Sequence, residues 1–206
     1  MRYNELTFQG RNAVLEAFRS GKTIDKLFIL DGCQDGPIKS IVREAKKTDA
    51  IINYVDKERL DRRAGTGHHQ GVVAIGAAYE YAEVDDILAA AKEKGEDPFI
   101  FILDEIEDPH NLGAIIRTAN LAGAHGVIIP KRRAVGLTAT VAKTSAGAIN
   151  YTPVAKVTNI PQTIEELKKQ GLWFVCADMG GETMYNLNLK GPIGLVIGNE
   201  GNGVSR

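Results

Sequence analysis

The sequence has little of what would place a protein in a special class. Its 206 residues include two cysteines, Cys33 and Cys176, which cannot build a disulfide framework and are typical of a reducing compartment. Aromatic residues make up 6% of the chain, no apolar run approaches the length that crosses a membrane, and no signal peptide is recognisable. We therefore expect a cytoplasmic globular protein, and the 44% of hydrophobic residues is enough for a sizeable core.

The chain also lacks an excess of either charge. It has 25 Lys and Arg residues against 26 Asp and Glu residues, for a net charge of −1. Composition therefore gives no argument for nucleic-acid binding, and any site for a polyanion has to be a local patch. A metal site is not expected either, because the adjacent His68 and His69 have no cysteine or carboxylate at a ligand spacing.

What the chain does contain is an alternation of strands and helices that indicates two α/β units. The expected strands lie at 26–30, 51–55, 71–77, 99–103, 127–129, 151–157, 172–177 and 193–197, and the expected helices at 12–20, 37–47, 84–94, 114–121, 138–146 and 161–169. We place the domains at 1–77 and 84–206 with a linker at 78–83, and residues 57–71 in a loop. Such alternation predicts a mostly parallel sheet with right-handed crossovers in the second unit.

The most informative segment runs from Phe99 to Gly123. A buried strand is followed by Asp108-Pro109, which ends it, and then by a helical pattern for which Asn111 is the expected N-cap. Open α/β sheets bind their ligands at the carboxyl ends of their strands, so we expect a site here.

Arg117 lies in the same segment, on a helix with apolar neighbours. Arginine is seldom buried unless it is paired, and its guanidinium suits a carboxylate or a phosphate. Two interpretations follow: Arg117 binds a ligand, or it forms a structural ion pair with Asp104 or Asp108.

The second informative segment, GNEGNG at 198–203, follows the last expected strand. Its glycines allow a sharp turn and a close approach to a ligand, and it carries the carboxylate of Glu200. A dinucleotide-binding loop is disfavoured, because such a loop follows the first strand of its unit and opens a helix. A plain turn is the other interpretation.

Together these segments resemble a known family. DPHNLGAIIRTA and LVIGNEGNGVS resemble motifs one and two of the SpoU (TrmH-type) RNA 2′-O-ribose methyltransferases of the SPOUT superfamily, and GRNAVLEAF, HHQGVVA and KTSAGA resemble the branch that methylates a guanosine in 23S ribosomal RNA. The resemblance implies an RNA-binding N-terminal domain like ribosomal protein L30e, a catalytic domain ending in a trefoil knot, S-adenosylmethionine as methyl donor, and a homodimer. Methylation of a tRNA ribose, or structured-RNA binding without catalysis, are the alternatives.

The third motif of that family, a Ser-Leu-Asn segment with the helix that closes the knot, is not found in the 206 residues. That motif supplies part of the methyl-donor pocket and of the dimer face. From the resemblance we therefore expect this polypeptide by itself to be inactive.

The resemblance also implies roles for individual residues. Arg117 is placed closest to the reacting ribose, Asn111 orients the ribose or Arg117, and Glu200 pairs with Arg117 or accepts the hydroxyl proton. The pKa of an arginine is too high for it to lose its proton near neutral pH, so Arg117 is poorly suited to act as a base. Phosphate anchoring is therefore favoured for Arg117, and Glu200 is the alternative base.

Binding residues complete these expectations. The cofactor is expected against two strand ends, at Ala177, Asp178, Met179, Ile197, Gly198, Asn199 and Gly201. RNA contacts are expected at Arg62, Arg63, His68, His69, Arg132, Arg133 and Lys143, with ordinary solvated surface as the alternative for each.

Overall fold

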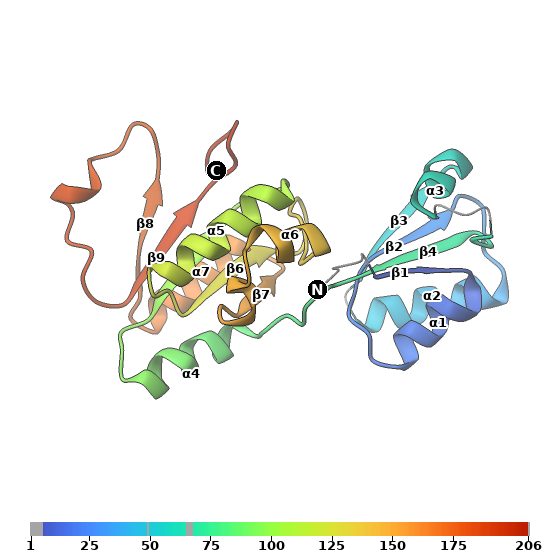
Figure 1. The fold of residues 1–206 in the computed structure, drawn as a ribbon, viewed down its shortest axis with the longest axis horizontal. Helices are drawn as coiled ribbons and strands as arrows, with labels where there is room; N and C mark the ends of the chain where they lie inside the picture. The colour runs from blue at the N-terminus through green and yellow to red at the C-terminus, as the bar shows by residue number, and fades with distance from the viewer. Residues whose placement is uncertain (1–5, 49, 65–67, 206) are drawn as a thin grey trace. The chain divides into compact units, whose positions relative to one another are not determined.

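The computed structural model describes residues 6–48, 50–64 and 68–205. The chain divides into two compact units, Met1–Glu80 and Tyr81–Arg206, and each has a sheet of its own (Figure 1). In the part of the chain that is described, no helix combines the length and apolar character that a bilayer crossing requires.

The first unit is a four-stranded sheet in the order β1-β4-β2-β3. Strand β4 is antiparallel to both β1 and β2, whereas β2 and β3 are parallel. Its elements are β1 (Leu6–Gln9), α1 (Arg11–Arg19), β2 (Ile24–Leu30), α2 (Gly36–Lys47), β3 (Ile51–Val55), α3 (Lys57–Ala64) and β4 (Val72–Gly76).

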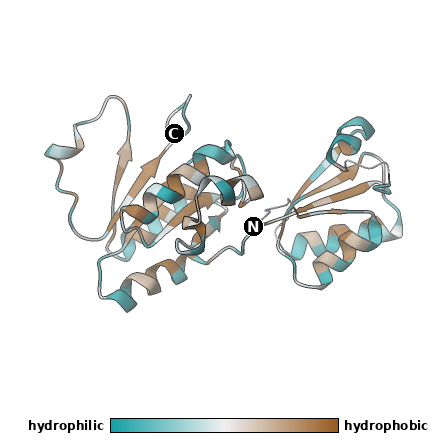
Figure 2. Cartoon of the chain, viewed as in Figure 1, coloured by the Kyte–Doolittle hydropathy of each residue, from teal (hydrophilic) through white to brown (hydrophobic). Residues whose placement is uncertain are grey.

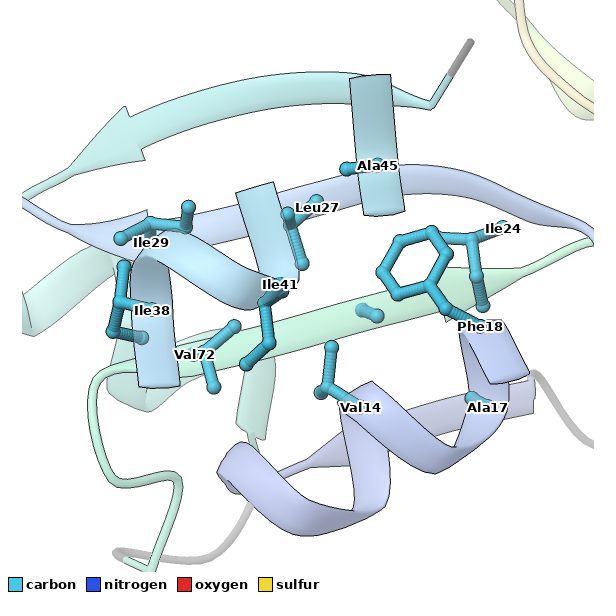
Figure 3. Close-up of a cluster of buried hydrophobic side chains, with 11 residues drawn as sticks. Val14, Ala17, Phe18, Ile24, Leu27, Ile29, Ile38, Ile41, Ala45 and Val72 are labelled. Atoms are coloured by element: carbon cyan, nitrogen blue, oxygen red, sulfur yellow. The ribbon is translucent and has the colours of Figure 1, made fainter. Parts of the chain in front are cut away.

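Both faces of this sheet are covered, as the alternation of side chains along its strands requires. Leu27 and Ile29 of β2 point to the face that carries α1 and α2, where they join a buried apolar cluster (Figure 3). Phe28, between them, points to the opposite face and packs with Leu60 of α3. Apolar residues accordingly follow the strands and the inner sides of the helices (Figure 2).

Helix α3 and strand β1 were not predicted from the sequence. Residues 57–64 were expected in a loop, but they form a helix because Leu60 is fully buried and the Asp56 carboxylate accepts a hydrogen bond of 2.8 Å from the backbone N–H of Arg59. The arginines of this segment therefore lie on a regular element, whose positions are fixed by its packing on the sheet.

The second unit is a five-stranded sheet in the order β7-β6-β5-β9-β8, and every strand pair in it is parallel. This confirms the predicted α/β class. Its elements are α4 (Val84–Lys94), β5 (Phe99–Leu103), α5 (Pro109–Leu121), β6 (Gly126–Pro130), α6 (Ala139–Thr144), η1 (Ala148–Asn150), β7 (Val154–Val157), α7 (Ile160–Lys169), β8 (Trp173–Ala177), η2 (Met184–Asn186) and β9 (Ile193–Ile197).

The central strand β5 is buried on both sides. Ile100 and Ile102 pack in one apolar cluster with Ile87 of α4 and Leu167 of α7. Helix α5 buries Leu112 and two further apolar side chains and packs closely against α6. The polar residues of this segment therefore begin at the carboxyl end of β5, outside the apolar core.

The start of α5 differs from the prediction. Asp108, not Asn111, is the N-cap: its carboxylate accepts a hydrogen bond of 2.7 Å from the backbone N–H of His110. Pro109 decides this, because proline holds Asp108 in an extended conformation and is itself favoured at the first helical position. Asn111 consequently lies inside the first turn, with its amide free to reach another segment.

Gly113 allows α5 and α6 to approach each other. A Cβ at this position would overlap with the Thr144 side chain of α6. The Thr144 hydroxyl lies within hydrogen-bond distance of the carbonyl of Pro109, at 3.3 Å, and so links α6 to the start of α5. The first turn of α5, which carries Asn111, is therefore held by direct packing against α6.

Candidate functional site

Three neighbouring strands end together at one edge of the parallel sheet. Ile197, the last residue of β9, is in register with Leu103 at the end of β5 and with Ala177 at the end of β8. The two polar segments predicted from the sequence thus leave the sheet side by side, as parallel strands require.

Asn111 and Glu200 are brought together at this edge. The side-chain amide nitrogen of Asn111, from the first turn of α5, donates a hydrogen bond of 3.3 Å to Oε2 of Glu200, from the loop after β9. Asn111 is half-buried and Glu200 is exposed. The carboxylate is therefore fixed through one oxygen, and its other oxygen is available to a ligand.

The loop that carries Glu200 is closed by Asn199. The backbone groups of Asn199 and Gly203 exchange two hydrogen bonds, of 2.9 and 2.8 Å, which join the two ends of the loop. The Asn199 side chain accepts a hydrogen bond of 2.9 Å from the N–H of Gly201 and donates one of 2.9 Å to the carbonyl of Glu105. Asn199 therefore uses its backbone and its amide to shape the loop, and the backbone groups left for a ligand are those of its neighbours.

Gly198 is the point at which the loop crosses itself. A Cβ there would overlap with the backbone of Gly203 and Val204, which no rotation of a side chain could relieve. The glycine predicted to face a cofactor is thus also required for the loop to close.

Asp104 anchors the chain after this loop. It is buried, with 6% of its surface exposed, and its carboxylate accepts a hydrogen bond of 2.6 Å from the backbone N–H of Ser205. A carboxylate at this depth needs such a partner. Among the described residues neither Asp104, which holds Ser205, nor Asp108, which caps α5, forms an ion pair with Arg117.

Arg117 is exposed, and no hydrogen bond or ion pair joins it to any residue the structure describes. It follows Asn111 by six residues, which on a helix of 3.6 residues per turn places it about 120° away around the helix axis. No ion pair joins Arg117 to Glu200 among the described residues, and the bond seen at Glu200 comes from Asn111. Arg117 offers a free guanidinium on a different side of α5.

The other segment expected at the cofactor follows β8. Ala177 and Asp178 are exposed, and Met179 is fully exposed. Asp178 accepts a hydrogen bond of 2.7 Å from the N–H of Met179, and its backbone carbonyl accepts one of 3.5 Å from the N–H of Gly181 across the turn at the strand end. The apolar surface of Ala177 and Met179 therefore lies open beside Ile197.

The cations expected near this edge fall into two kinds. Arg133 forms an ion pair of 2.8 Å with Glu105, and the hydrogen bond to that carboxylate raises the pKa of the guanidinium above its usual value. Arg132 and Lys143 are exposed, and neither is bonded to a described residue. Only the second kind offers a charge to a phosphate without first breaking a bond within the chain.

The residues of the first unit that are expected to contact RNA also fall into two kinds, exposed side chains and one that is bonded within the chain. Arg62 and Arg63 are exposed on α3, and the Arg63 guanidinium lies 4.1 Å from the centre of the Phe28 ring. His68 is exposed, but His69 is buried: its Nε2 lies 2.8 Å from Asp61, and its Nδ1 accepts a hydrogen bond of 3.0 Å from the N–H of Gly71. The assignment of His69 to an RNA contact is corrected accordingly, because both ring nitrogens are used within the chain.

Two residues with no distinctive sequence signal, Glu105 and Arg59, also contribute. Glu105 links the loop after β9 to Arg133, and Arg59 lies on α3 three residues before Arg62. The spacing of Arg59, Arg62 and Arg63 would have revealed a shared helix face, had the helix itself been predicted. Within the described ranges, no three His, Cys, Asp or Glu side chains gather as a metal site would require.

Comparison with known proteins covers both units. The family model described as the SpoU rRNA Methylase family matches residues 98–206, and the one described as RNA 2′-O ribose methyltransferase substrate binding matches residues 9–82. YacO of Bacillus subtilis (strain 168), assigned to the TrmH family of tRNA/rRNA methyltransferases, is 52% identical over 96% of this chain and 79% of its own length. A Staphylococcus haemolyticus protein with the same family assignment is 46% identical over 98% of this chain and 81% of its own length.

Solved structures share the fold. The SpoU methyltransferase AviRb of Streptomyces viridochromogenes, in complex with AdoMet, superposes with a TM-score of 0.55 at 20% identity, covering 98% of this chain and 75% of its own. The AdoMet-bound rRNA methyltransferase of Sinorhizobium meliloti gives a TM-score of 0.53 at 22% identity, covering 97% and 73%.

Proposed function

Because this chain belongs to the SpoU rRNA Methylase family, we propose that it transfers a methyl group from S-adenosylmethionine to a ribose 2′-hydroxyl of RNA, namely that of a guanosine in 23S ribosomal RNA. We further propose that it works in the cytoplasm as a homodimer whose catalytic domain ends in a trefoil knot. The ribose specificity is supported by the match of residues 9–82 to a 2′-O ribose methyltransferase substrate-binding family.

The observation that carries this proposal is the hydrogen bond of 3.3 Å between Asn111 and Glu200. It joins two segments that lie 89 residues apart in the sequence, at the sheet edge where open α/β folds bind ligands. A carboxylate fixed by an amide, and still exposed, is suited to accept a proton from a hydroxyl group.

The same edge fits the proposed cofactor. Gly198 and Gly201 present backbone without side chains, and Ala177 and Met179 offer exposed apolar surface one strand away. We assign the cofactor to these residues together with Asp178 and Ile197, while Asn199 holds the loop in shape. When bound, S-adenosylmethionine supplies an electrophilic methyl group on a sulfonium.

The side chains of the protein have to activate the ribose hydroxyl and position the RNA. A ribose hydroxyl is a weak nucleophile, so transfer to its oxygen requires a base and accurate positioning. Glu200 accepts the hydroxyl proton through its free oxygen, and Asn111 keeps that carboxylate oriented. Arg117 anchors a phosphate of the RNA, for which its planar fork of donors is suited.

Mapping of 2′-O-methyl groups in the RNA of cells that lack the gene tests this function. We expect one guanosine of 23S ribosomal RNA to lose its methyl group and to regain it when the wild-type gene is restored, but not when Glu200→Gln is restored. Loss of a methyl group from a tRNA instead would contradict the ribosomal substrate. An unchanged methylation pattern in both RNAs would contradict the enzymatic function.

A further inference from the structure

A hollow of about 510 Å³ lies in the first unit, between α3 and strand β3. Arg59, Arg62 and Arg63 of α3 line one side, and Phe28, Asn53 and Val55 of the sheet line the other. Its volume is in the range of clefts that hold small molecules. The mechanism proposed above uses none of these residues except as general RNA contacts.

The position of the hollow follows from how α3 covers the sheet. Val55 packs in the same cluster as Phe28 and Leu60, so the face it points to is the one that carries α3. Asn53, two residues earlier on β3, points to the same face. Helix α3 packs against β2 and β4, while β3 is the edge strand. The sheet surface at β3 is therefore left partly uncovered.

The charge of the hollow is of one sign. No Asp or Glu is found among the described residues that line it, and the nearby Asp61 is bonded to His69. The ion pairs of Arg59 with Asp56 and of Arg62 with Glu58 are long, at 3.5 and 3.7 Å, and join exposed side chains. Exposed pairs of this kind contribute little and are easily exchanged for a phosphate.

A second hollow of the same unit also contains an arginine, but that arginine is bonded within the chain. Its arginine, Arg11, donates to Asp35 at 2.5 Å and to the carbonyl of Gln70 at 3.1 Å, so its guanidinium already serves the fold. The α3 arginines have no such commitments among the described residues beyond the two long pairs and the stacking of Arg63 on Phe28.

We propose that the α3 hollow holds one unpaired nucleotide of the RNA substrate, with its phosphate against Arg59 and Arg62 and its base between Asn53 and the Arg63 guanidinium. Proteins read RNA sequence mainly from unpaired bases, which stack on aromatic rings or guanidinium planes and bond to polar side chains. The Asn53 amide provides a donor and an acceptor for a base edge, and the one bond that it makes to a described residue is long, at 3.4 Å. The inference rests on the proposed function in taking RNA as the substrate class.

Binding of two fluorescent RNAs by the whole chain tests this proposal: a hairpin with unpaired loop nucleotides, and a blunt duplex made of the same stem. We expect Asn53→Ala to weaken binding of the hairpin by about five- to a hundredfold and to leave binding of the duplex unchanged. Arg59→Ala combined with Arg62→Ala is expected to flatten the dependence of log K on log salt by about 0.7 for each phosphate that the protein no longer neutralises.

Arg43→Ala is the matched control, because Arg43 is an exposed arginine of α2 with a single contact of 3.7 Å to Glu44. It should change neither affinity nor salt dependence. Thermal denaturation of each variant shows whether the fold is kept, and the arginine variants, whose side chains are exposed, test the hollow even where Asn53→Ala is unstable.

Two results would overturn the proposal: equally weakened binding of both RNAs by Asn53→Ala with the fold intact, or a salt dependence in the arginine variant that matches Arg43→Ala. Either would leave the methylation experiment unaffected. Hairpin selectivity that depends on Asn53, found together with unchanged cellular methylation, would support the hollow and contradict the proposed function.

Discussion

The two candidate sites of this protein are built in opposite ways. The site at the edge of the parallel sheet depends on a loop, whose geometry rests on backbone hydrogen bonds at Asn199 and Gly203 and on the buried carboxylate of Asp104. The hollow beside α3 consists of side chains on a helix and a strand, whose backbones are fixed by ordinary packing around Leu60.

This difference predicts how each site responds to change. In the α3 hollow each of several arginines contributes part of the RNA-binding free energy, so the loss of one charge removes only that part. The loop after β9 has no such redundancy, because each bond in it fixes the position of Glu200. Small changes are therefore expected to matter most at the sheet edge.

The largest effect is expected for Gly198→Ala. The added Cβ would overlap with the backbone of Gly203 and Val204, and opening the loop to relieve this overlap should cost about 3 kcal/mol or more. Calorimetry on a protein that also contains the third motif should then show S-adenosylmethionine binding weakened by more than a hundredfold. Gly36→Ala, where a Cβ meets nothing within 4 Å, is the control. Normal cofactor binding by Gly198→Ala would show that the loop is less constrained than its contacts indicate.

In a protein that also contains the third motif, Arg117→Lys should reduce methyl transfer by about a hundredfold. Lysine keeps the charge but loses the planar fork, and misplacement of a reacting group by about one ångström can have this effect. Cofactor affinity should stay the same, because Arg117 is proposed to anchor the RNA and is not among the residues assigned to the cofactor. Measuring transfer and cofactor binding on the same protein separates the two. A transfer rate near that of the wild type would refute phosphate anchoring by Arg117.

Asp104→Asn is expected to have a moderate effect. The amide can still accept the hydrogen bond from Ser205, but a bond to a neutral acceptor is weaker than one to a carboxylate by about 1 kcal/mol. Urea denaturation should report this loss, and cofactor affinity should fall by about fivefold. Asp97→Asn, an exposed aspartate just before β5, should change neither quantity. Equal effects of the two substitutions would mean that the anchor is dispensable.

The smallest effect is expected for Lys143→Ala. This exposed lysine has no bond to a described residue, so its loss should flatten the salt dependence of RNA binding by at most about 0.9. Lys168→Ala serves as the control, because Lys168 is held by Glu165 at 2.7 Å on α7. If Lys143→Ala proved as damaging as Gly198→Ala, the contrast between shared charge and constrained loop would not hold.

Much of the sheet-edge site was predictable because it follows from topology. Once β5 and β9 are recognised as parallel buried strands, their carboxyl ends meet, and Asn111 and Glu200 come into range of each other. The exact start of α5 was not predictable in the same way. Asp108 and Asn111 are both good caps, and the choice depends on how Pro109 constrains the residue before it.

The first unit shows where sequence patterns fail. Six of the eight residues of KERLDRRA are charged, so α3 has almost no apolar periodicity, and its helix depends on the burial of Leu60 and Ala64 against β2 and β4 of the sheet. Likewise, nothing in the sequence distinguishes His68 from His69. Their different surroundings come from Asp61 and Gly71, which bond to the second of the two.

The double hydrogen bond between Asn199 and Gly203 has a consequence for solvent exchange. Amide protons in loops normally exchange with deuterium quickly, but those of Asn199 and Gly203 bond to each other's carbonyls, and that of Gly201 bonds to the Asn199 side chain. These three amides should exchange slowly, and their protection factors should report the free energy of opening the loop. Ligands that dock on the closed loop would slow this exchange further, which offers a residue-level signal of occupancy that needs no turnover.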